Sequence, residues 1–512
     1  MPTVASGRFA RRRVTGLQSL VAARFPLAQR RASSLYRTNH DPIPMRPITA
    51  LAVVAALAGA DRLASQTWTL QNPPPYPTTL ARRAGGLAWH PAAGGVVMYG
   101  GLQSGTTLVL NDTWVWNGAT WTQLTPATTP PARWGHRMVY DSRRGRLVTF
   151  GGRSPTTTAN ANDTWEYDGV DWQQVFPTAS PTARAFYGMA FDERRGQVVM
   201  YGVQSGLAAA GGNQTWLYDG TTWTQAAPAT VPPGLEQPAM AYDKGRGVVV
   251  MFGGFNGTPP GTDYRTTYEW DGANWTLKAT TNAPLTGYRT GMVYDDYRGR
   301  VVLYGGFASA TVQQKTWEYD GNDWTQVGSG GPGKISEGYM AFLPTTGETV
   351  YFGGSGPTVT GTVNNETWTY SGPTNAIASK YGKGCPTSAG VPDFAPASTP
   401  VLGGNYSLAL TGAPAVAIGL VVHGFDNLQF APGVWLPFDL TLAGIPGCGL
   451  EVRPDVTAVE LPVGGTFTHV LAMPNTPTLS GLGLWSQALV IDGGSPNGFA
   501  GISNGVHGVL GN

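Results

Sequence analysis

The sequence has few cysteines, few charged side chains and no long apolar run. Only two of its 512 residues are cysteine, 12% are charged, and the six histidines show no spacing typical of metal ligands. No apolar stretch reaches the roughly 20 residues that a transmembrane helix needs. These absences predict no resident metal, no cofactor and no membrane span in the mature chain.

The formal charge of +2 does not indicate a nucleic-acid partner. Residues 1–60 hold nine of the 33 basic residues and one of the 31 acidic ones, which leaves 24 basic and 30 acidic residues and a net charge of −6 for the remainder. A net negative body lacks the basic surface that nucleic-acid binding requires. We therefore expect no nucleic-acid partner.

The N-terminal part has the features of a secretory leader. Residues 45–65 begin with Met45-Arg46, continue through an apolar stretch at 48–58, and end in small residues suited to cleavage. Residues 1–44 are Arg-rich, and they represent either a start codon placed too far upstream or a cytoplasmic pre-segment. The expected location is outside the cell, at its surface or in the periplasm, where Cys385 and Cys448 favour one disulfide over a metal site.

Glycine, proline and tryptophan are abundant and are arranged in a repeat of about 51 residues. Each of six copies pairs a strand that ends in glycine with a W-x-Y-D-G-x-x-W type hairpin. The glycines open at Gly100, Gly151, Gly202, Gly253, Gly305 and Gly353. Asp-Gly and Asn-Gly between strands indicate tight hairpins. Because one such unit cannot bury its own faces, the repeat predicts a ring or a solenoid.

The second copy predicts four antiparallel strands, at 135–140, 146–152, 164–167 and 171–174. Four such strands make one propeller blade. The glycine pair followed by an aromatic residue and a Trp resembles the kelch repeat over residues 66–372. This resemblance implies a kelch-type propeller related to the central domain of galactose oxidase. Two departures are Val203, which replaces the second glycine, and the last copy, which has no Trp strand after residue 372.

The missing strand has a candidate at the other end of the chain. Residues 66–71 match 119–124, so we expect them to complete the last copy and close a six-bladed all-β propeller over 66–375. Residues 380–512 lose the repeat and show short alternating strands, which predict a β-sandwich. Segments around both cysteines resemble a C-terminal module of exported bacterial proteins. We expect a monomer.

Strand connectivity separates two ends of the propeller. Charged turns such as 192–196 lie between the first and second strands of a copy, and we expect them to be solvated surface. The opposite end carries the longer loops, 102–111, 153–162, 204–213, 255–265, 307–315 and 355–366. Recognition tends to reside on such loops, which a rigid scaffold holds in place.

Candidate binding residues lie next to these loops, and they are Arg82, Arg133, Trp134, Arg184, Tyr187, Glu236, Arg289 and Glu337. In peptide-binding kelch proteins, arginines at this position help form the ligand surface. The structural alternative is that the arginines hydrogen-bond carbonyl groups around the central channel. Likewise, the aromatic residues either stack on sugar rings or pack between blades.

Enzymatic readings find little support. The copper site of galactose oxidase needs two His, two Tyr and a Cys cross-linked to Tyr, whereas this propeller has no cysteine and only His90 and His136, at non-equivalent positions. A glycosidase or lyase needs paired carboxylates, and only Glu236 and Glu337 can be placed near the axis. No catalytic residue is assigned. The sequence favours an exported, non-catalytic protein that binds protein or carbohydrate; a carbohydrate-active hydrolase or lyase is the alternative.

Overall fold

The protein is described from a computed structural model of the chain. The described residues are 67–71, 80–103, 108–155, 159–202, 213–256, 263–308, 311–328, 330–356, 364–371, 377–381, 385, 387–415, 417–424, 429–431, 434–435, 438–439, 449–450, 456–476, 483–492, 494–495 and 500–510. Residues 1–65, Cys448 and parts of all six long loops lie outside them. Within these ranges no helix is long and apolar enough to cross a membrane.

The part between residues 67 and 371 contains six antiparallel sheets of four or five strands, numbered here sheet 1 to sheet 6. Sheet 1 holds β2 (Arg82–Arg83), β3 (Gly86–His90), β4 (Gly95–Gln103), β5 (Val109–Trp116) and β6 (Trp121–Leu124). Sheet 2 holds β7 (Arg137–Asp141), β8 (Arg146–Phe150), β9 (Thr164–Tyr167) and β10 (Trp172–Val175). Sheet 3 holds β11 (Gly188–Asp192), β12 (Gln197–Tyr201), β13 (Thr215–Tyr218) and β14 (Trp223–Ala226).

The second half of this part repeats the pattern. Sheet 4 holds β15 (Ala239–Asp243), β16 (Val248–Phe255), β17 (Asp263–Trp270) and β18 (Trp275–Lys278). Sheet 5 holds β19 (Gly291–Asp295), β20 (Arg300–Tyr304), β23 (Thr316–Tyr319) and β24 (Trp324–Gln326), with a short hairpin of β21 (Phe307–Ala308) and β22 (Thr311–Val312) beside it. Sheet 6 holds β25 (Tyr339–Leu343), β26 (Glu348–Phe352), β27 (Thr367–Ser371) and β1 (Thr67–Gln71).

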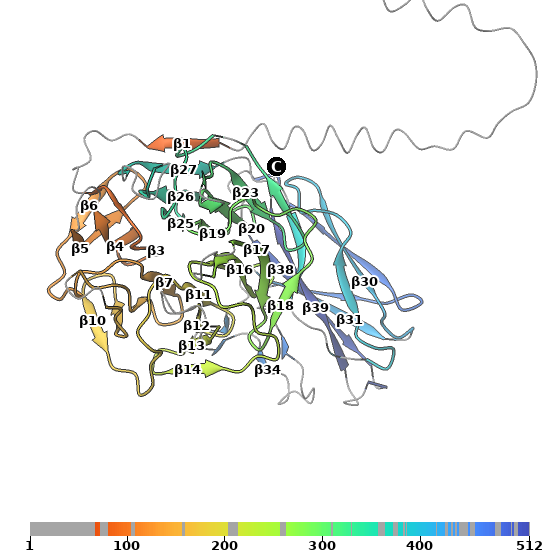
Figure 1. Ribbon diagram of the computed structural model, residues 1–512. Helices are drawn as coiled ribbons and strands as arrows, with labels where there is room; N and C mark the ends of the chain where they lie inside the picture. Colours follow the sequence, from red (N-terminus) through yellow and green to blue (C-terminus); the bar gives the residue numbers. More distant parts are fainter. Residues whose placement is uncertain are drawn as a thin grey trace, which may run out of the picture. The chain divides into compact units, whose positions relative to one another are not determined.

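Strand β1 belongs to the last sheet although it comes first in the chain. It pairs antiparallel with β27, from Thr67 opposite Ser371 to Gln71 opposite Thr367. Figure 1 shows β1 as the outermost strand beside β27, with β26 and β25 further in. Sheet 6 therefore combines two segments that are about 300 residues apart.

The boundaries of the second copy differ slightly from the sequence prediction. The inner strand begins at Arg137 rather than at 135, and β8 ends at Phe150 rather than at 152. Gly135, Gly151 and Gly152 have φ values of +69°, +53° and +92°, which take them out of the extended conformation. A Cβ on Gly151 would lie 2.6 Å from the carbonyl oxygen of Arg184. The glycine is required because the link to the next sheet passes close over it.

Indole–hydroxyl hydrogen bonds join each sheet to the next. In each sheet, the Trp of the outermost strand donates its indole N–H to the hydroxyl of a Thr. This Thr lies in the third strand of the preceding sheet. The pairs are Trp172 with Thr113 (3.0 Å), Trp223 with Thr164 (3.0 Å), Trp275 with Thr215 (2.9 Å), Trp324 with Thr267 (2.8 Å), Trp68 with Thr316 (2.8 Å) and Trp121 with Thr367 (2.8 Å). The last pair joins sheet 1 to sheet 6.

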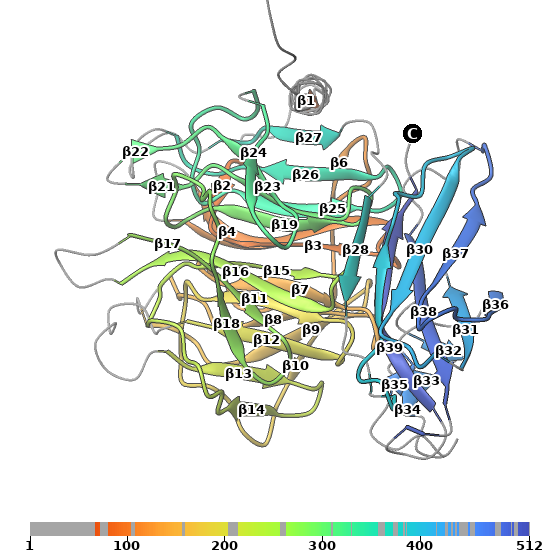
Figure 2. The same cartoon turned by 90° about the vertical axis from the view of Figure 1, so that its right-hand side faces the viewer.

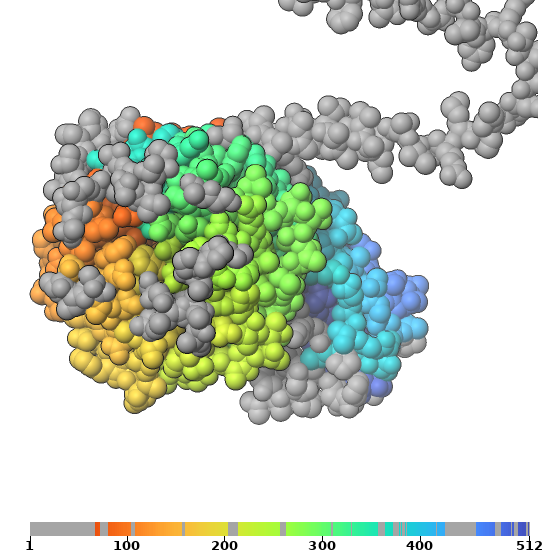
Figure 3. Space-filling view, in the orientation of Figure 1, coloured from red at the N-terminus to blue at the C-terminus, as the bar shows by residue number. Residues whose placement is uncertain are grey.

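Apolar packing follows the same order. Buried clusters join sheets 1 and 2, 2 and 3, 3 and 4, 4 and 5, and 5 and 6, and a further cluster places Leu87 and Trp116 of sheet 1 against Leu343 and Phe352 of sheet 6. Figure 1 shows β3, β7, β11, β19 and β25 nearest the centre, with β6, β10 and β14 outside. In Figure 3 the colours follow the chain around this part from orange through yellow to green.

The charged turns between first and second strands are not simply solvated, as the sequence suggested. Asp192 and Asp295 are both 0% exposed. Asp295 accepts hydrogen bonds from the Arg298 backbone N–H (2.9 Å), the Arg298 guanidinium (2.5 Å) and the Thr349 hydroxyl (2.8 Å). The carboxylate is buried because it satisfies the backbone of its own turn and pairs with the arginine three residues on.

The C-terminal part contains two larger sheets. One has the order β28 (Ile377–Tyr381), β39 (Ala500–Val509), β38 (Gly483–Ile491), β31 (Ile418–Gly424), β36 (Val456–Glu460), and the other has the order β29 (Asp393–Pro396), β30 (Asn405–Thr411), β37 (Phe467–Ala472). Both contribute to one buried cluster that includes Phe394, Leu408, Val421 and Val490. Two short pairs are β32 (Gln429–Ala431) with β33 (Val434–Trp435) and β34 (Phe438–Asp439) with β35 (Gly449–Leu450). Cys385 is buried, but Cys448 lies outside the described residues, so the disulfide stays a prediction.

Candidate functional site

The long-loop end of the sheets is the predicted recognition end. Figure 2 shows β17, β21 and β22 extending on the left, where the second strand of each sheet passes into the third. The candidate residues that precede the inner strands lie at this same end. Their side chains differ in their surroundings: three arginines are buried and paired, two residues form a polar cluster, and the others are dispersed.

Arg82, Arg133 and Arg184 form the first group, and all three are at most 2% exposed. The Arg82 guanidinium donates two parallel hydrogen bonds to Asp112 (2.6 and 2.9 Å), and Arg133 does the same to Asp163 (2.8 and 2.7 Å). Each arginine also donates to the backbone carbonyl of the glycine that opens the glycine motif of its own sheet. These glycines are Gly100, Gly151 and Gly202.

These contacts correspond to the structural alternative for the arginines. In Arg82 and Arg133 the guanidinium is occupied by a carboxylate and by backbone carbonyls, and in Arg184 it is occupied by the side-chain oxygens of Gln214 and Thr182 and by backbone carbonyls, so few donors remain for a ligand. Burial by itself raises the pKa values of Asp112 and Asp163. Hydrogen bonds from Arg82 and Arg133 nevertheless hold the pKa of each aspartate below the usual range. A ligand role for the three arginines stays a prediction, and their observed contacts are structural.

Two other predicted residues, Arg289 and Glu337, belong to a belt of residues with positive φ. Each belt residue lies two residues before the innermost strand of a sheet. Its members are Ala84 (+54°), Gly135 (+69°), Phe186 (+61°), Gln237 (+56°), Arg289 (+59°) and Glu337 (+61°). Five of the six are not glycine, and such backbone strain concentrates at functional sites because the surrounding structure must hold it. Among the belt residues, backbone N–H groups donate to the preceding member in the pairs Gly135 to Ala84 (2.5 Å), Phe186 to Gly135 (2.7 Å), Gln237 to Phe186 (2.6 Å), Glu337 to Arg289 (3.0 Å) and Ala84 to Glu337 (3.2 Å).

Glu337 is the centre of a polar cluster on this belt. Its carboxylate forms ion pairs with Arg83 and with Arg289 (3.2 Å), and Arg289 also donates to the side chain of Gln237 (3.0 Å). The carboxylate of Glu337 is 5% exposed, whereas the two arginine side chains are 18% and 19% exposed. The structure thus brings together two of the predicted residues, Arg289 and Glu337, and adds Arg83 and Gln237.

The remaining predicted residues are more dispersed. Trp134 is half-buried and stacks edge-on against Phe186, with the guanidinium of Arg153 5.8 Å from its ring. Tyr187 is fully buried, and its hydroxyl accepts from the Arg137 backbone N–H (3.3 Å) and donates to the Phe150 carbonyl. Tyr187 is therefore part of the packing between sheets, the alternative weighed for the aromatic residues, whereas Trp134 is only half-buried.

Among the described residues, Glu236 directly precedes the belt residue Gln237. Its backbone exchanges hydrogen bonds with Phe255, the N–H of Glu236 donating at 2.7 Å and that of Phe255 at 2.9 Å. Over the same ranges no group of three or more His, Cys, Asp or Glu side chains is placed to hold a metal ion. His136 is fully buried, and burial lowers its pKa to about 3.

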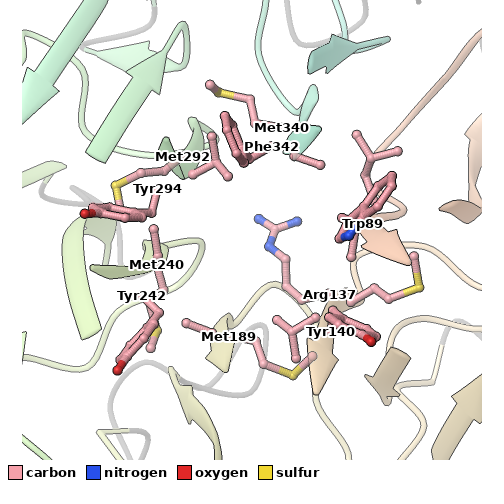
Figure 4. A pocket seen from close by; sticks show the side chains of 18 of the residues that line it. Trp89, Arg137, Tyr140, Met189, Met240, Tyr242, Met292, Tyr294, Met340 and Phe342 are labelled. Carbon is pink, nitrogen blue, oxygen red and sulfur yellow. The ribbon is translucent and has the colours of Figure 1, made fainter. Parts of the chain in front are cut away.

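A cavity of about 270 Å³ lies between the inner strands of all six sheets. Most of the residues that line it are apolar or aromatic in type, although the surface they expose to the cavity is about equally polar and apolar, and Figure 4 shows methionine and aromatic side chains around it with Arg137 pointing into the middle. The other charged lining residues are Glu193, Lys244 and Asp296, and Lys244 lies 4.0 and 3.9 Å from the two carboxylates. Arg137 is a residue that sequence reasoning missed.

The signal for Arg137 is present in the repeat. Arg137 opens its inner strand, and at this position the other copies have Gly86, Gly188, Ala239, Gly291 and Tyr339. A lone charged side chain at a position that is otherwise small or aromatic distinguishes one copy from the rest. That comparison requires the exact strand boundaries. The sequence prediction placed them differently because it included the glycines at 135 and 151–152 in the strands.

Residues 86–261 match the model of the KLHDC2/KLHL20/DRC7 Kelch-repeats domain. The match covers sheet 1 apart from β2, all of sheets 2 and 3, and the first two strands of sheet 4, β15 and β16. The chain therefore carries a kelch-repeat domain over these residues, within an all-β structure of repeated four-stranded sheets.

Proposed function

We propose that residues 66–375 form a six-bladed kelch propeller closed by β1, and that residues 380–512 form a β-sandwich with a Cys385–Cys448 disulfide. The closure is supported by the Trp121–Thr367 bond and by the buried cluster that joins sheet 6 to sheet 1. Sharing one sheet between both ends of the repeat covers the two open edges that the ends of the repeat would otherwise present to another chain. We expect a monomer for the same reason.

We propose further that the protein is an exported, non-catalytic binding module that recognises a protein or a glycan at the long-loop end of the propeller. The observation that carries this proposal is the cluster of Arg83, Gln237, Arg289 and Glu337 on the positive-φ belt. Two partly exposed arginines share one buried carboxylate, so the cluster keeps positive charge and free donors toward solvent. Trp134, the neighbour of the belt residue Gly135, supplies a half-buried aromatic side chain.

This arrangement favours recognition of an acidic group beside an apolar or sugar face. Arginine presents a planar fork that matches a carboxylate, and an aromatic face accepts the apolar side of a sugar or a side chain. The alternative, a carbohydrate-active enzyme, is less well supported because the carboxylate of Glu337 is engaged by two guanidinium groups. A general acid or a nucleophile needs a carboxyl group that reaches the substrate.

The test compares binding by the secreted chain and its variants on glycan arrays and in pull-downs from the native surroundings. We expect Arg289→Ala and Trp134→Ala to weaken binding by about tenfold or more. Arg146→Ala is the matched control, because Arg146 lies at the opposite end of its sheet, is 38% exposed and pairs only with the exposed Asp168 at 3.1 Å. Binding that survives both belt substitutions, or that Arg146→Ala weakens equally, would place recognition elsewhere.

A further inference from the structure

The central cavity contains a charged group without a charged partner of its own. The half-buried guanidinium of Arg137 has no hydrogen bond or ion pair to any described residue, while its backbone N–H donates to Tyr187. The nearest acid with an electrostatic effect on it is Glu337, which already pairs with Arg83 and Arg289. These four side chains carry three positive charges and one negative charge.

The geometry explains why this side chain enters the cavity. In three other sheets the first residue of the inner strand is glycine, and a Cβ there would collide with the methionine of the following sheet. The distances are 2.7 Å from Gly86 to Met138, 2.6 Å from Gly188 to Met240 and 2.7 Å from Gly291 to Met340. The corresponding methionine after sheet 2 is Met189. Because that space is filled, the Arg137 side chain extends toward the middle of the cavity, as Figure 4 shows.

The other charged residues of the cavity do not neutralise Arg137. Glu193, Lys244 and Asp296 lie in or beside the turns that follow the inner strands, at the end opposite to Arg137, and Lys244 lies between the two carboxylates. The wall between these two ends is made of small and apolar side chains such as Ala190, Val293 and Ala341. Several of the lining residues are only half-buried, so solvent reaches the cavity.

From these observations we propose that the cavity is a binding site for a small organic carboxylate, in which Arg137 holds the carboxylate and the methionine and aromatic wall holds an apolar body. A guanidinium that points into a cavity without a carboxylate partner favours an anion that satisfies its fork, and the methionine side chains adapt to the shape of the apolar part. Small-ligand pockets combine apolar residues with a few polar groups that fix the orientation of the ligand. The proposal does not depend on the function proposed above, although Glu337 acts on Arg137 as well as on the two arginines of the belt cluster.

The probe is phenylacetate, which joins one carboxylate to one ring, and its neutral matched compound is phenylacetamide. Calorimetric titration of the full mature chain should show phenylacetate binding at least about tenfold more tightly than phenylacetamide, and acetate alone binding more weakly than phenylacetate. Arg137→Gly should remove the preference for the charged compound. Glycine is the appropriate substitution because three other sheets have it at this position, and an unchanged melting temperature would verify the fold.

Three outcomes would overturn the proposal. They are equal affinity for the charged and neutral compounds, a preference for phenylacetate that persists in Arg137→Gly, and no binding of phenylacetate up to about 10 mM, the range of the weakest specific ligands. Loss of macromolecular binding in the Arg289→Ala variant with unchanged phenylacetate binding would show that the two sites are independent.

Discussion

One buried arginine lacks the carboxylate that its counterparts have, and restoring that carboxylate should stabilise the protein. Arg133 forms a bidentate pair with Asp163, whereas Arg184, at the same place in the next sheet, meets the side-chain oxygen of Gln214 at 3.1 Å. Burial lowers the pKa of Arg184 to about 10, which expresses the cost of a charge without a charged partner. We predict that Gln214→Asp raises the free energy of unfolding.

The magnitude follows from the pKa. A depression from 12.5 to about 10 corresponds to about 3 kcal/mol of unfavourable charge burial. A new aspartate must itself be desolvated, so we expect a net gain of about 1–3 kcal/mol. The indole N–H of Trp216 now donates to Gln214 (3.0 Å), and the equivalent Trp165 donates to Asp163 (2.7 Å), so the substitution preserves this bond.

Urea unfolding of the wild type, Gln214→Asp and the reciprocal Asp163→Gln measures the effect. Asp163→Gln should lose stability by a similar or larger amount because it leaves Arg133 buried without its partner. The arginine lowers the pKa of a partner carboxylate below the value in the unfolded chain. The ion pair therefore makes its full contribution to the free energy of unfolding above about pH 4, and this contribution disappears as the pH falls through the pKa of the folded state. The gain from Gln214→Asp should therefore shrink at pH 3. A neutral or destabilising Gln214→Asp at pH 7 would refute the reasoning.

Two further predictions concern closure and acid stability. Deleting 66–71 should lower the melting temperature by more than about 5 °C in a single cooperative transition, because the deletion removes five strand pairings and the Trp68–Thr316 hydrogen bond. The control is Thr69→Ala, at an exposed position of the same strand. An unchanged transition after the deletion would contradict closure by β1. Burial lowers the pKa of His136 to about 3, so only the unfolded chain gains its proton as the pH falls from 6.5, and stability should fall by about 2 kcal/mol between pH 6.5 and pH 5. His136→Gln should remove this part of the pH dependence measured by urea unfolding, and an identical slope in both proteins would show that folding does not lower the pKa of His136.

The repeat could be predicted from the sequence because its residues act locally. The Asp-Gly turns, the glycine pairs and the alternating apolar strands each satisfy geometry within one sheet, and they recur in most of the copies. The tryptophans were also recognisable, although their partners were not. Each indole bonds a threonine of the preceding sheet, such as Trp223 with Thr164, and that pairing depends on how two sheets meet.

The candidate site was predicted less well because similar residues have different surroundings. Arg82, Arg133 and Arg289 look alike in the sequence, but the first two pair with buried aspartates, and Arg289 sits on the positive-φ belt beside Glu337. The acids that separate these roles are about 30 or more residues away along the chain. Side-chain type alone therefore did not indicate which of these arginines already have a buried partner.

The sequence alone determined the class of structure, since the period, the turn residues and the alternation of apolar side chains are properties of short segments. The tertiary structure decided which segments meet: β1 with β27, Asp163 with Arg133, and Arg137 with the cavity rather than with a carboxylate. The physical reason is that burial and pairing are set by neighbours that are distant in the chain. The same guanidinium group is a structural brace where an acid lies opposite it and a candidate ligand group where none does.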